Sequence, residues 1–193
     1  MNEDEFARAL LAHERKEWQD PEKILSQLKL ETGMVAADLA CGPGYFTIPL
    51  ARAVGTGGRV YAVDSSKVML DYLASNMKRS KNIGRTTINV VKSDITETRI
   101  ASSSVDIVLL ADILHDAPNQ ARLFSEIRRI SKQDSKLVVI DWKKKETGVG
   151  PAVAIRLAEN ESKKILRDND YGVNQTIDAG PFHYGLVCKQ VFL

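Results

Sequence analysis

Cysteine is scarce in this sequence, and the placement of the few cysteines argues against two kinds of protein. The chain has 193 residues, of which only Cys41 and Cys188 are cysteine. They stand far apart in the sequence, and neither has a CxxC partner or a histidine at metal-ligand spacing. A small disulfide-stapled fold and a structural zinc protein are therefore not expected, and we predict no metal site.

Long apolar runs and an excess of charge are also missing. No stretch approaches the roughly 18 apolar residues that a membrane span requires. The first segment, MNEDEFARALLAHERKEW, is charged throughout and lacks the apolar part of a signal peptide. Lys and Arg number 27 against 25 Asp and Glu, a net charge of +2 that does not indicate a nucleic-acid partner. These features predict a reduced, cytoplasmic protein without a membrane span.

Apolar segments alternate with helix-like segments along most of the chain. Five apolar runs are rich in Val, Ile and Leu and show little alternation of polar and apolar residues. Strands of that kind are buried on both faces, as in a parallel sheet covered by helices. The expected strands are Met34–Leu39, Arg59–Val63, Thr87–Val91, Val105–Leu110 and Lys136–Asp141.

The segments between these strands have the periodicity of helices. Each carries apolar residues three or four positions apart, which places them on one helix face. The strand–helix–strand order predicts a doubly wound α/β fold with right-handed crossovers and helices on both faces of the sheet. The expected helices are Phe46–Val54, Lys67–Ser80 and Asn119–Ile130.

The two ends of the chain depart from this alternation. Residues 3–30 are expected to form one or two helices, broken at Asp20-Pro21, and another helix is expected to run from Pro151 to about Asp168. Two final strands, Asn174–Asp178 and Tyr184–Phe192, are joined by so short a turn that they must be antiparallel neighbours.

The domain organisation follows from the lack of any dividing segment. No repeat, low-complexity stretch or linker interrupts the chain. We therefore predict one domain over residues 1–193, in which a helical cap, residues 1–30, precedes a core, residues 31–193.

The segment DLACGPGY, residues 38–45, is the most informative motif. Asp38 ends an apolar run, and a loop with Gly42 and Gly44 leads into the next helix. Asp64 ends the following strand, 20 positions after Gly44. Such loops bring backbone close to a ligand, and a carboxylate at this spacing accepts hydrogen bonds from both hydroxyls of a ribose. The pattern predicts a nucleoside-containing cofactor; the alternative is a tight turn with a helix-capping aspartate.

Two nucleoside cofactors compete for this loop. A nicotinamide dinucleotide favours GxGxxG, but Thr47 occupies the last glycine position here. Asp38 would also repel a pyrophosphate and attract a cation. S-adenosylmethionine carries an ammonium and a sulfonium and no phosphate, so the loop favours it.

Four segments in order resemble the motifs of the class I S-adenosylmethionine-dependent methyltransferases. VAADLACGPGYFTIPLA is similar to their glycine-rich first motif, and VYAVDSS to the acidic loop after the second strand. VKSDITE and VDIVLLADILHD are similar to the motifs that follow the third and fourth strands. The resemblance covers about residues 30–193 and is nearest to the small methyltransferases related to ubiquinone and menaquinone biosynthesis. It implies a Rossmann-like, seven-stranded, mostly parallel sheet of order 3-2-1-4-5-7-6 with strand 7 antiparallel.

The resemblance implies that the first loop holds the methionine part of the cofactor. Asp38 would organise the loop beside the ammonium group, and Ala40, Gly42 and Gly44 would allow backbone to approach. The family usually has glycine where Ala40 stands, and alanine fits there if the backbone is not at positive φ.

The resemblance assigns the rest of the cofactor to loops after the next strands. Asp64 would bind the ribose hydroxyls with Ser65 beside the adenine. Asp94 would accept from the adenine amino group, while Ile95 would donate its backbone N–H and pack on the ring. Ala111, just after the fourth strand, would offer its carbonyl to the ammonium. The alternative for Asp94 is a solvated loop acid.

Candidate catalytic and acceptor residues follow the fourth and fifth strands. A base is needed only if the acceptor must lose a proton early, and His115 is the candidate because an imidazole titrates near neutrality. The alternative is that His115 packs at the start of the next helix. Asp112, Trp142 and His183 are the candidates for the wall of the acceptor pocket.

The sequence narrows the acceptor by elimination. No NPPY-like tetrapeptide of amine-methylating enzymes follows the fourth strand, and no clustered cysteines suggest thiol-based arsenic chemistry. A small molecule is therefore the expected acceptor. A non-catalytic protein that binds S-adenosylmethionine or S-adenosylhomocysteine stays open, a nicotinamide oxidoreductase is disfavoured, and a homodimer is neither required nor excluded.

Overall fold

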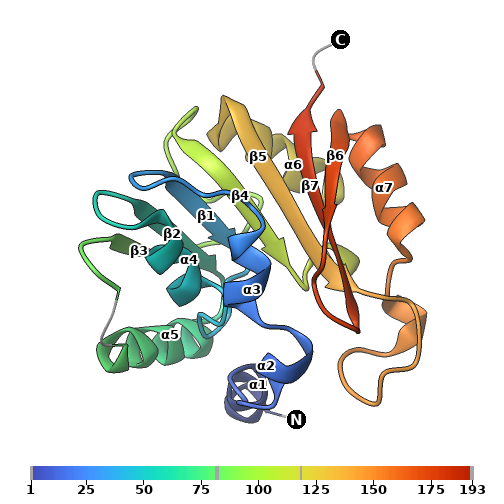
Figure 1. The fold of residues 1–193 in the computed structure, drawn as a ribbon, viewed down its shortest axis with the longest axis horizontal. Helices are drawn as coiled ribbons and strands as arrows, with labels where there is room; N and C mark the ends of the chain where they lie inside the picture. Colours follow the sequence, from blue (N-terminus) through green and yellow to red (C-terminus); the bar gives the residue numbers. More distant parts are fainter. Residues whose placement is uncertain (1, 81–82, 118, 192–193) are drawn as a thin grey trace.

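The centre of the protein is a seven-stranded sheet in the order β3-β2-β1-β4-β5-β7-β6 (Figure 1). The computed structural model of the chain describes residues 2–80, 83–117 and 119–191. β7 runs antiparallel to both of its neighbours, and the pairs from β3 to β5 are all parallel. The predicted strand order and the single antiparallel strand are confirmed.

The strands and helices follow one another along the chain with few irregular segments. The strands are β1 Val35–Leu39, β2 Arg59–Asp64, β3 Thr87–Lys92, β4 Val105–Ala111, β5 Ser131–Trp142, β6 Tyr171–Ile177 and β7 His183–Gln190. The helices are α1 Glu3–Leu10, α2 Arg15–Trp18, α3 Pro21–Ser26, α4 Thr47–Val54, α5 Lys67–Arg79, α6 Gln120–Ile130 and α7 Glu159–Asp168, with short 3-10 helices η1 Leu114–Asp116 and η2 Val153–Ile155.

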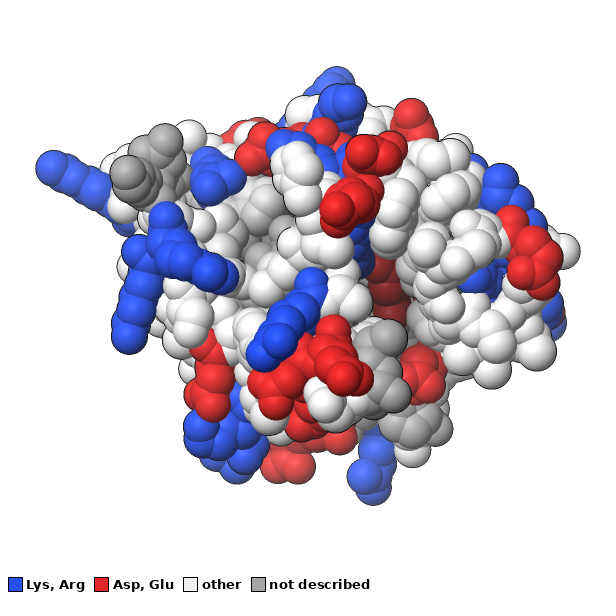
Figure 2. Space-filling model, turned by 90° about the horizontal axis from the view of Figure 1, so that it is seen from below, with Lys and Arg blue, Asp and Glu red and all other residues white. Residues whose placement is uncertain are grey.

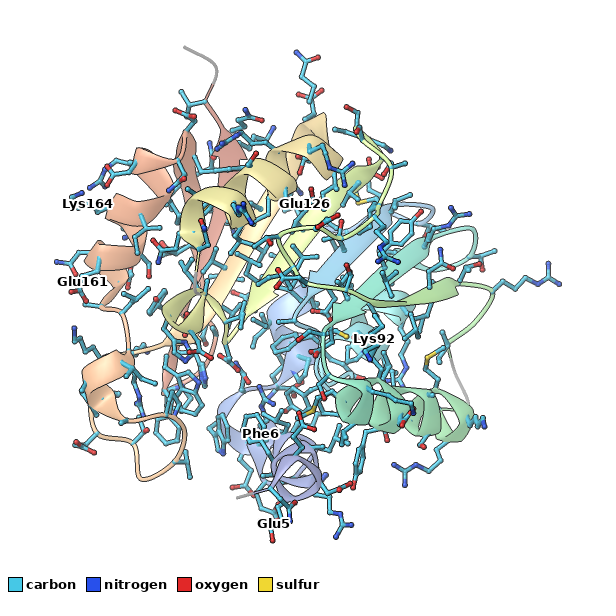
Figure 3. All side chains as sticks on the ribbon, turned by 180° about the vertical axis from the view of Figure 1, so that it is seen from behind. Glu5, Phe6, Lys92, Glu126, Glu161 and Lys164 are labelled. Atoms are coloured by element: carbon cyan, nitrogen blue, oxygen red, sulfur yellow. The ribbon has the colours of Figure 1, made fainter. Side chains whose placement is uncertain are left out.

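Helices cover both faces of the sheet, as predicted. Successive residues of a strand point to opposite faces, so Leu109 packs with the α3–α4 side and Leu110 with the α6–α7 side. Figure 3 shows α6 and α7 lying over one face, while Figure 1 shows α3, α4 and α5 on the other. The edge strand β3 is an exception to the expected two-sided burial, because several of its residues, including Val90, are exposed.

Two of the predicted strands begin several residues earlier in the structure, while β7 ends at Gln190 and the predicted end of that strand, Phe192, lies outside the described residues. β5 begins at Ser131, earlier than the predicted Lys136, because Ser131 pairs with Val105 ahead of a bulge. β6 begins at Tyr171, earlier than the predicted Asn174, because the Tyr171 ring is buried against Phe124. Tertiary contacts therefore extended both strands beyond the apolar runs that predicted them.

The prediction of one helix from Pro151 to Asp168 is wrong for its first half. Residues there form only the short η2, and α7 begins at Glu159. The buried guanidinium of Arg156 donates hydrogen bonds to four backbone carbonyls and lies 4.8 Å from the Trp142 ring centre. These carbonyls belong to Pro151, Lys143, Lys145 and Val149, so the Arg156 side chain fixes this segment against the loop that precedes it.

The N-terminal segment forms three short helices rather than the expected one or two. α1 packs on α5, and α3 buries Ile24 and Leu25 against the α4 side of the sheet. Asp20 caps α3 through the N–H groups of Glu22 and Lys23, with Pro21 in the first turn. In Figure 1, α1 and α2 lie beneath the carboxyl ends of the central parallel strands. No helix in the described parts of the chain is long and apolar enough to cross a membrane.

Candidate functional site

The predicted site residues lie along one rim of the sheet, at the carboxyl ends of its parallel strands. Ligands bind at this rim in open α/β sheets. The candidate cofactor residues follow β1, β2, β3 and β4, and the candidate acceptor residues follow β4 and β5 or begin β7. Figure 2 views the molecule from this side and shows acidic and basic side chains intermingled around a narrow recess with acidic atoms at depth.

The loop after β1 is held in a conformation that favours glycine. Gly42 has φ 54° and Gly44 has φ 90°, and a Cβ on Gly44 would collide with the Leu73 side chain. Ala40 has φ 58°, so the condition under which alanine fits without strain is not met. An L-residue in this region costs about 1–2 kcal/mol, and the loop carries that strain where the motif I pattern has glycine.

Asp64 ties the end of β2 to this loop. Its Oδ2 accepts the Gly42 N–H at 2.8 Å, and its Oδ1 accepts the Ser66 N–H at 2.8 Å. Each carboxylate oxygen can accept a second hydrogen bond. Asp64 therefore both fixes the loop and keeps acceptor capacity for a ligand.

Asp38 and Thr47 form a buried pair at the base of the loop. Thr47 Oγ1 donates to Asp38 Oδ2 at 2.6 Å, and both side chains are buried. Burial is the main reason that the pKa of Asp38 rises to about 7; the Asp64 charge adds to this, and the Thr47 hydrogen bond opposes it. Asp38 thus titrates near neutral pH, where a nearby cation would favour its ionised form.

The loops after β2 and β3 expose the remaining cofactor candidates. Ser65 and Asp94 are exposed, and Ile95 is partly buried against the α6 side of the core. Asp94 Oδ1 accepts both the N–H and the hydroxyl of Thr96 at 2.7 Å, and these hydrogen bonds lower its pKa. Asp94 is therefore a tethered, ionised acid at the end of the rim.

Asp112, next to the candidate Ala111, is clamped by the N-terminal cap. Its carboxylate accepts from Arg15 Nη2 at 2.7 Å and from Gln19 Nε2 at 3.2 Å, across 97 and 93 residues of sequence. Burial raises the pKa of Asp112, but His183, Arg15 and Gln19 together hold it below its usual value. Asp112 also has φ 58°, a strained conformation of the kind that clusters at functional sites.

Aromatic rings surround the clamp. His183 pairs in register with Trp142, their ring centres lie 4.1 Å apart, and Trp18 from α2 stacks on His183 with an interplanar angle of 8°. His183 Nε2 is 3.3 Å from Asp112 Oδ1, yet neither ring nitrogen has a hydrogen-bond partner in the described residues. The structure therefore brings together all three predicted pocket residues, with the cap as their cover.

His115 is joined to a buried carboxylate on the next strand. Its Nδ1 lies 2.6 Å from Asp141 Oδ1, and its backbone N–H donates to Asp141 Oδ2 at 3.0 Å. Burial lowers the pKa of His115, but the hydrogen bond and charge of Asp141, with smaller contributions from Asp112 and Asp116, raise it above 6.5 overall. The alternative that His115 only packs at the start of the next helix does not account for this contact with Asp141.

Several residues of the rim were not identified as site residues from the sequence. Arg15, Gln19 and Trp18 come from the cap, and no local motif marks them. Two other residues carry a sequence signal that could have identified them. Thr47 stands at the last glycine position of the GxGxxG pattern, and Asp141 is an acid at the end of an apolar strand. No group of three or more His, Cys, Asp or Glu side chains that could hold a metal ion occurs within residues 2–80, 83–117 and 119–191.

The sequence matches a known family and several curated relatives. The profile of the family described as methyltransferase domain matches residues 37–139. A demethylmenaquinone methyltransferase of Lactobacillus johnsonii is 34% identical over 119 residues, which cover 62% of this chain and 48% of that protein. One of Bacillus velezensis is 28% identical over 145 residues, 75% of this chain and 60% of that protein. The chain thus matches only about half of the length of these relatives.

Solved structures resemble the chain over nearly its whole length. A methyltransferase of Aquifex aeolicus that depends on S-adenosylmethionine superimposes with a TM-score of 0.86 and 29% identity, covering 96% of this chain and 97% of that one. A structure from Sulfolobus solfataricus described as a type 11 methyltransferase gives a TM-score of 0.73 and 26% identity over 91% of this chain and 95% of that one. With the matching family profile and the confirmed strand order, the chain belongs to the class I S-adenosylmethionine-dependent methyltransferases.

Proposed function

We propose that the protein transfers a methyl group from S-adenosylmethionine to a small-molecule acceptor. The observation that carries this proposal is the pairing of the positive-φ loop after β1 with Asp64, whose oxygens accept the Gly42 and Ser66 N–H groups. The family uses S-adenosylmethionine, and the curated relatives are named for methylation of demethylmenaquinone. Those names support a small organic acceptor and do not identify it.

The residues present fit the cofactor. Asp64 retains acceptor capacity for the ribose hydroxyls, and the backbone of the loop through Gly42 and Gly44 would face the methionine part. Asp38, whose burial raises its pKa to about 7, gains a favourable partner if an ammonium lies near it. Asp94 would accept from the adenine amino group beside Ile95, with Ser65 on the same side. The Ala111 carbonyl would complete the ammonium site together with the backbone at Ala40.

The acceptor pocket is proposed to lie between Asp112, Trp142 and His183, beneath the cap. Trp142 and His183 present aromatic surface, and Asp112 is already neutralised by Arg15. Such a lining suits a planar, mostly apolar acceptor with a polar edge. Both cysteines are free and buried, which is consistent with the proposed cytoplasmic location.

Calorimetric titration of the purified protein tests the cofactor. S-adenosylmethionine and S-adenosylhomocysteine should both bind, and NADH should bind at least tenfold more weakly. Tighter binding of NADH would replace the proposed function with a nicotinamide-dependent one.

A methyl-label transfer screen over cell extract then tests the reaction. Label in a small organic fraction supports the proposed function. Binding of both sulfur compounds without transfer to any extract fraction would instead favour a non-catalytic binding protein.

A further inference from the structure

Asp141 is a buried carboxylate whose hydrogen-bond partners all belong to the rim. It lies at the end of β5, and its side chain is fully buried. Its oxygens accept the backbone N–H groups of His115 and Trp142, at 3.0 and 2.8 Å, and contact His115 Nδ1 at 2.6 Å. No lysine or arginine among the described residues pairs with it. Within the described residues, the His115 imidazole is therefore the only ionisable side chain in direct contact with this carboxylate.

This contact determines which nitrogen of His115 carries the proton. An ionised carboxylate only accepts hydrogen bonds, so Nδ1 must be the donor. The neutral ring then has its lone pair on Nε2, as when a carboxylate orients a catalytic histidine. Among residues 2–80, 83–117 and 119–191, Nε2 has no hydrogen-bond partner and is not one of the fully buried polar atoms. Nε2 is therefore the ring nitrogen left to accept a proton, on a side chain that is 7% exposed.

His115 lies where such a nitrogen can act. It follows β4 by one short turn, and β4 pairs directly with β1, whose loop is the proposed cofactor site. The neighbouring His183 provides a comparison within the same rim. Its ring is also buried but is packed between Trp18 and Trp142, and its Nε2 lies 3.3 Å from Asp112 Oδ1 without forming a hydrogen bond within the described residues. Two rim histidines are thus held in two ways, one by aromatic packing and one by a carboxylate.

We propose that Asp141 is a positioning residue that presents His115 Nε2 as the proton acceptor of the reaction. It follows that the acceptor is a molecule that loses a proton on methylation, such as a phenol or an enol. This inference rests on the proposed methyltransferase function and adds the chemical class of its acceptor.

The proton and electron balance of the step is complete with these groups. When bound, S-adenosylmethionine supplies the methyl group, whose bond to sulfur breaks and leaves its electron pair on sulfur. The acceptor oxygen forms the new bond to that carbon, and its O–H proton moves to His115 Nε2. The resulting imidazolium is stabilised by the Asp141 carboxylate, and its proton passes to water before the next turnover.

Three carboxylates face the His115 ring and favour its protonated form. Asp141 faces it from β5, Asp112 from the end of β4, and Asp116 from η1. From β7, the Tyr184 hydroxyl is engaged by Ser162 at 2.6 Å. The carboxylates raise the pKa of His115 above 6.5, so the neutral, proton-accepting ring is populated as the pH rises through that higher value.

The substitution Asp141→Asn is the sharpest test. The carbonyl oxygen of asparagine can still accept the backbone N–H of His115, but its NH2 group, in the place of Oδ1, would donate to Nδ1 and so place the proton on Nε2, and the Trp142 N–H would lose its acceptor. We expect turnover to fall by about 10²–10⁴-fold, the range for loss of general-base catalysis, with S-adenosylhomocysteine affinity unchanged within twofold. Asp116→Asn is the matched control, because it removes a nearby charge without touching Nδ1, and should keep at least a third of the turnover.

Nitrogen-15 NMR of the His115 ring in the wild-type protein gives a readout that needs neither a variant nor an acceptor. The expected result is a neutral ring protonated on Nδ1, with a pKa above the usual value of about 6.5 for an imidazole. A ring protonated on Nε2 overturns the proposal, and so does an Asp141→Asn protein that folds and keeps wild-type turnover.

A substrate panel tests the acceptor class. Phenols should take labelled methyl groups, and thioethers and tertiary amines, which have no proton to lose, should not. Equal labelling of both sets by wild type and His115→Gln would overturn the inference while leaving the methyltransferase function intact. Failure to bind S-adenosylhomocysteine would instead contradict the function itself.

Discussion

The two halves of the rim are built in different ways. In the cofactor half, around β1 and β2, the partners lie within 22 residues of each other: Asp38 accepts from Thr47 nine residues on, and Asp64 accepts from Ser66 two residues on and from Gly42 22 residues back. In the acceptor half, around β4, β5 and β7, the contacts reach further along the sequence, as far as the N-terminal cap. Asp112 bonds Arg15 across 97 residues, and His115 bonds Asp141 across 26.

This difference explains why one half is recognisable as a motif and the other is not. A loop with positive φ angles and an acid at the end of a strand requires particular residue types at neighbouring positions. Such a requirement is visible as a short sequence motif. The contact of Arg15 and Gln19 with Asp112 joins residues that are far apart in the sequence and meet only in the folded protein. It therefore leaves no short motif. The acceptor half should therefore depend more on tertiary contacts, and substitutions can test that.

The largest effect on stability is expected at the clamp in the acceptor half. Arg15→Ala leaves the Asp112 carboxylate buried with only Gln19 and His183 near it. Breaking a buried ion pair on one side costs about 3–5 kcal/mol, which urea denaturation would measure. The double variant Arg15→Met with Asp112→Asn should recover much of the loss, because asparagine tolerates the positive φ at this position. A loss no larger than that of Lys16→Ala, at an exposed residue, would show that the clamp contributes little.

In the cofactor half, the expected effect is mainly on binding. Asp64→Ala removes two proposed hydrogen bonds to the ribose, each contributing roughly 1.5–3 kcal/mol, so S-adenosylhomocysteine should bind at least tenfold more weakly by calorimetry. Asp71→Ala, an exposed acid on α5, is the control. Unchanged affinity of the Asp64 variant would show that Asp64 only fixes the loop. The main support for the cofactor site would then be lost.

A smaller, pH-dependent effect is expected from Asp38. Its folded pKa, raised to about 7 mainly by burial, lies above the unfolded value. Its contribution to stability is therefore complete below about pH 4 and is lost as pH rises through 7. A bound ammonium would favour the ionised form, so affinity for S-adenosylmethionine should rise by about threefold to tenfold from pH 5.5 to 7. Asp38→Asn should abolish the rise; an equal rise in that variant would place the titrating group elsewhere.

The smallest effect is expected at Ala40. Relieving its positive φ favours glycine by about 1–2 kcal/mol, while glycine's extra freedom in the unfolded chain costs about 0.5–1 kcal/mol. Ala40→Gly should therefore raise stability by about 0.5–1 kcal/mol, whereas Ala37→Gly in β1 should lower it. If thermal unfolding shows Ala40→Gly to be less stable than wild type, the loop is not strained at this residue.

Most of the sheet could be predicted because a continuous apolar run indicates a strand that is buried on both faces. The runs that became β1, β2 and β4 were located to within one residue at each end. The prediction failed at 151–158, where the buried Arg156 side chain donates to carbonyls of residues 143–151 and fixes the segment in an irregular conformation. Neither that contact nor the pairing of Ser131 with Val105 leaves a periodic pattern in the sequence. The single-domain organisation with a cap, the homodimer and the cytoplasmic location stay predictions.

The sequence by itself determined the β/α order, the glycine loop with Asp38 and Asp64, and therefore the family, because these features depend on neighbouring residues and on burial. Only the tertiary structure decided that Ala40 has positive φ, that Arg15 and Gln19 clamp Asp112, and that Asp141 holds His115. The physical reason is range: a hydrogen bond between residues 26 or 97 positions apart exists only after the sheet has aligned the strands that carry them.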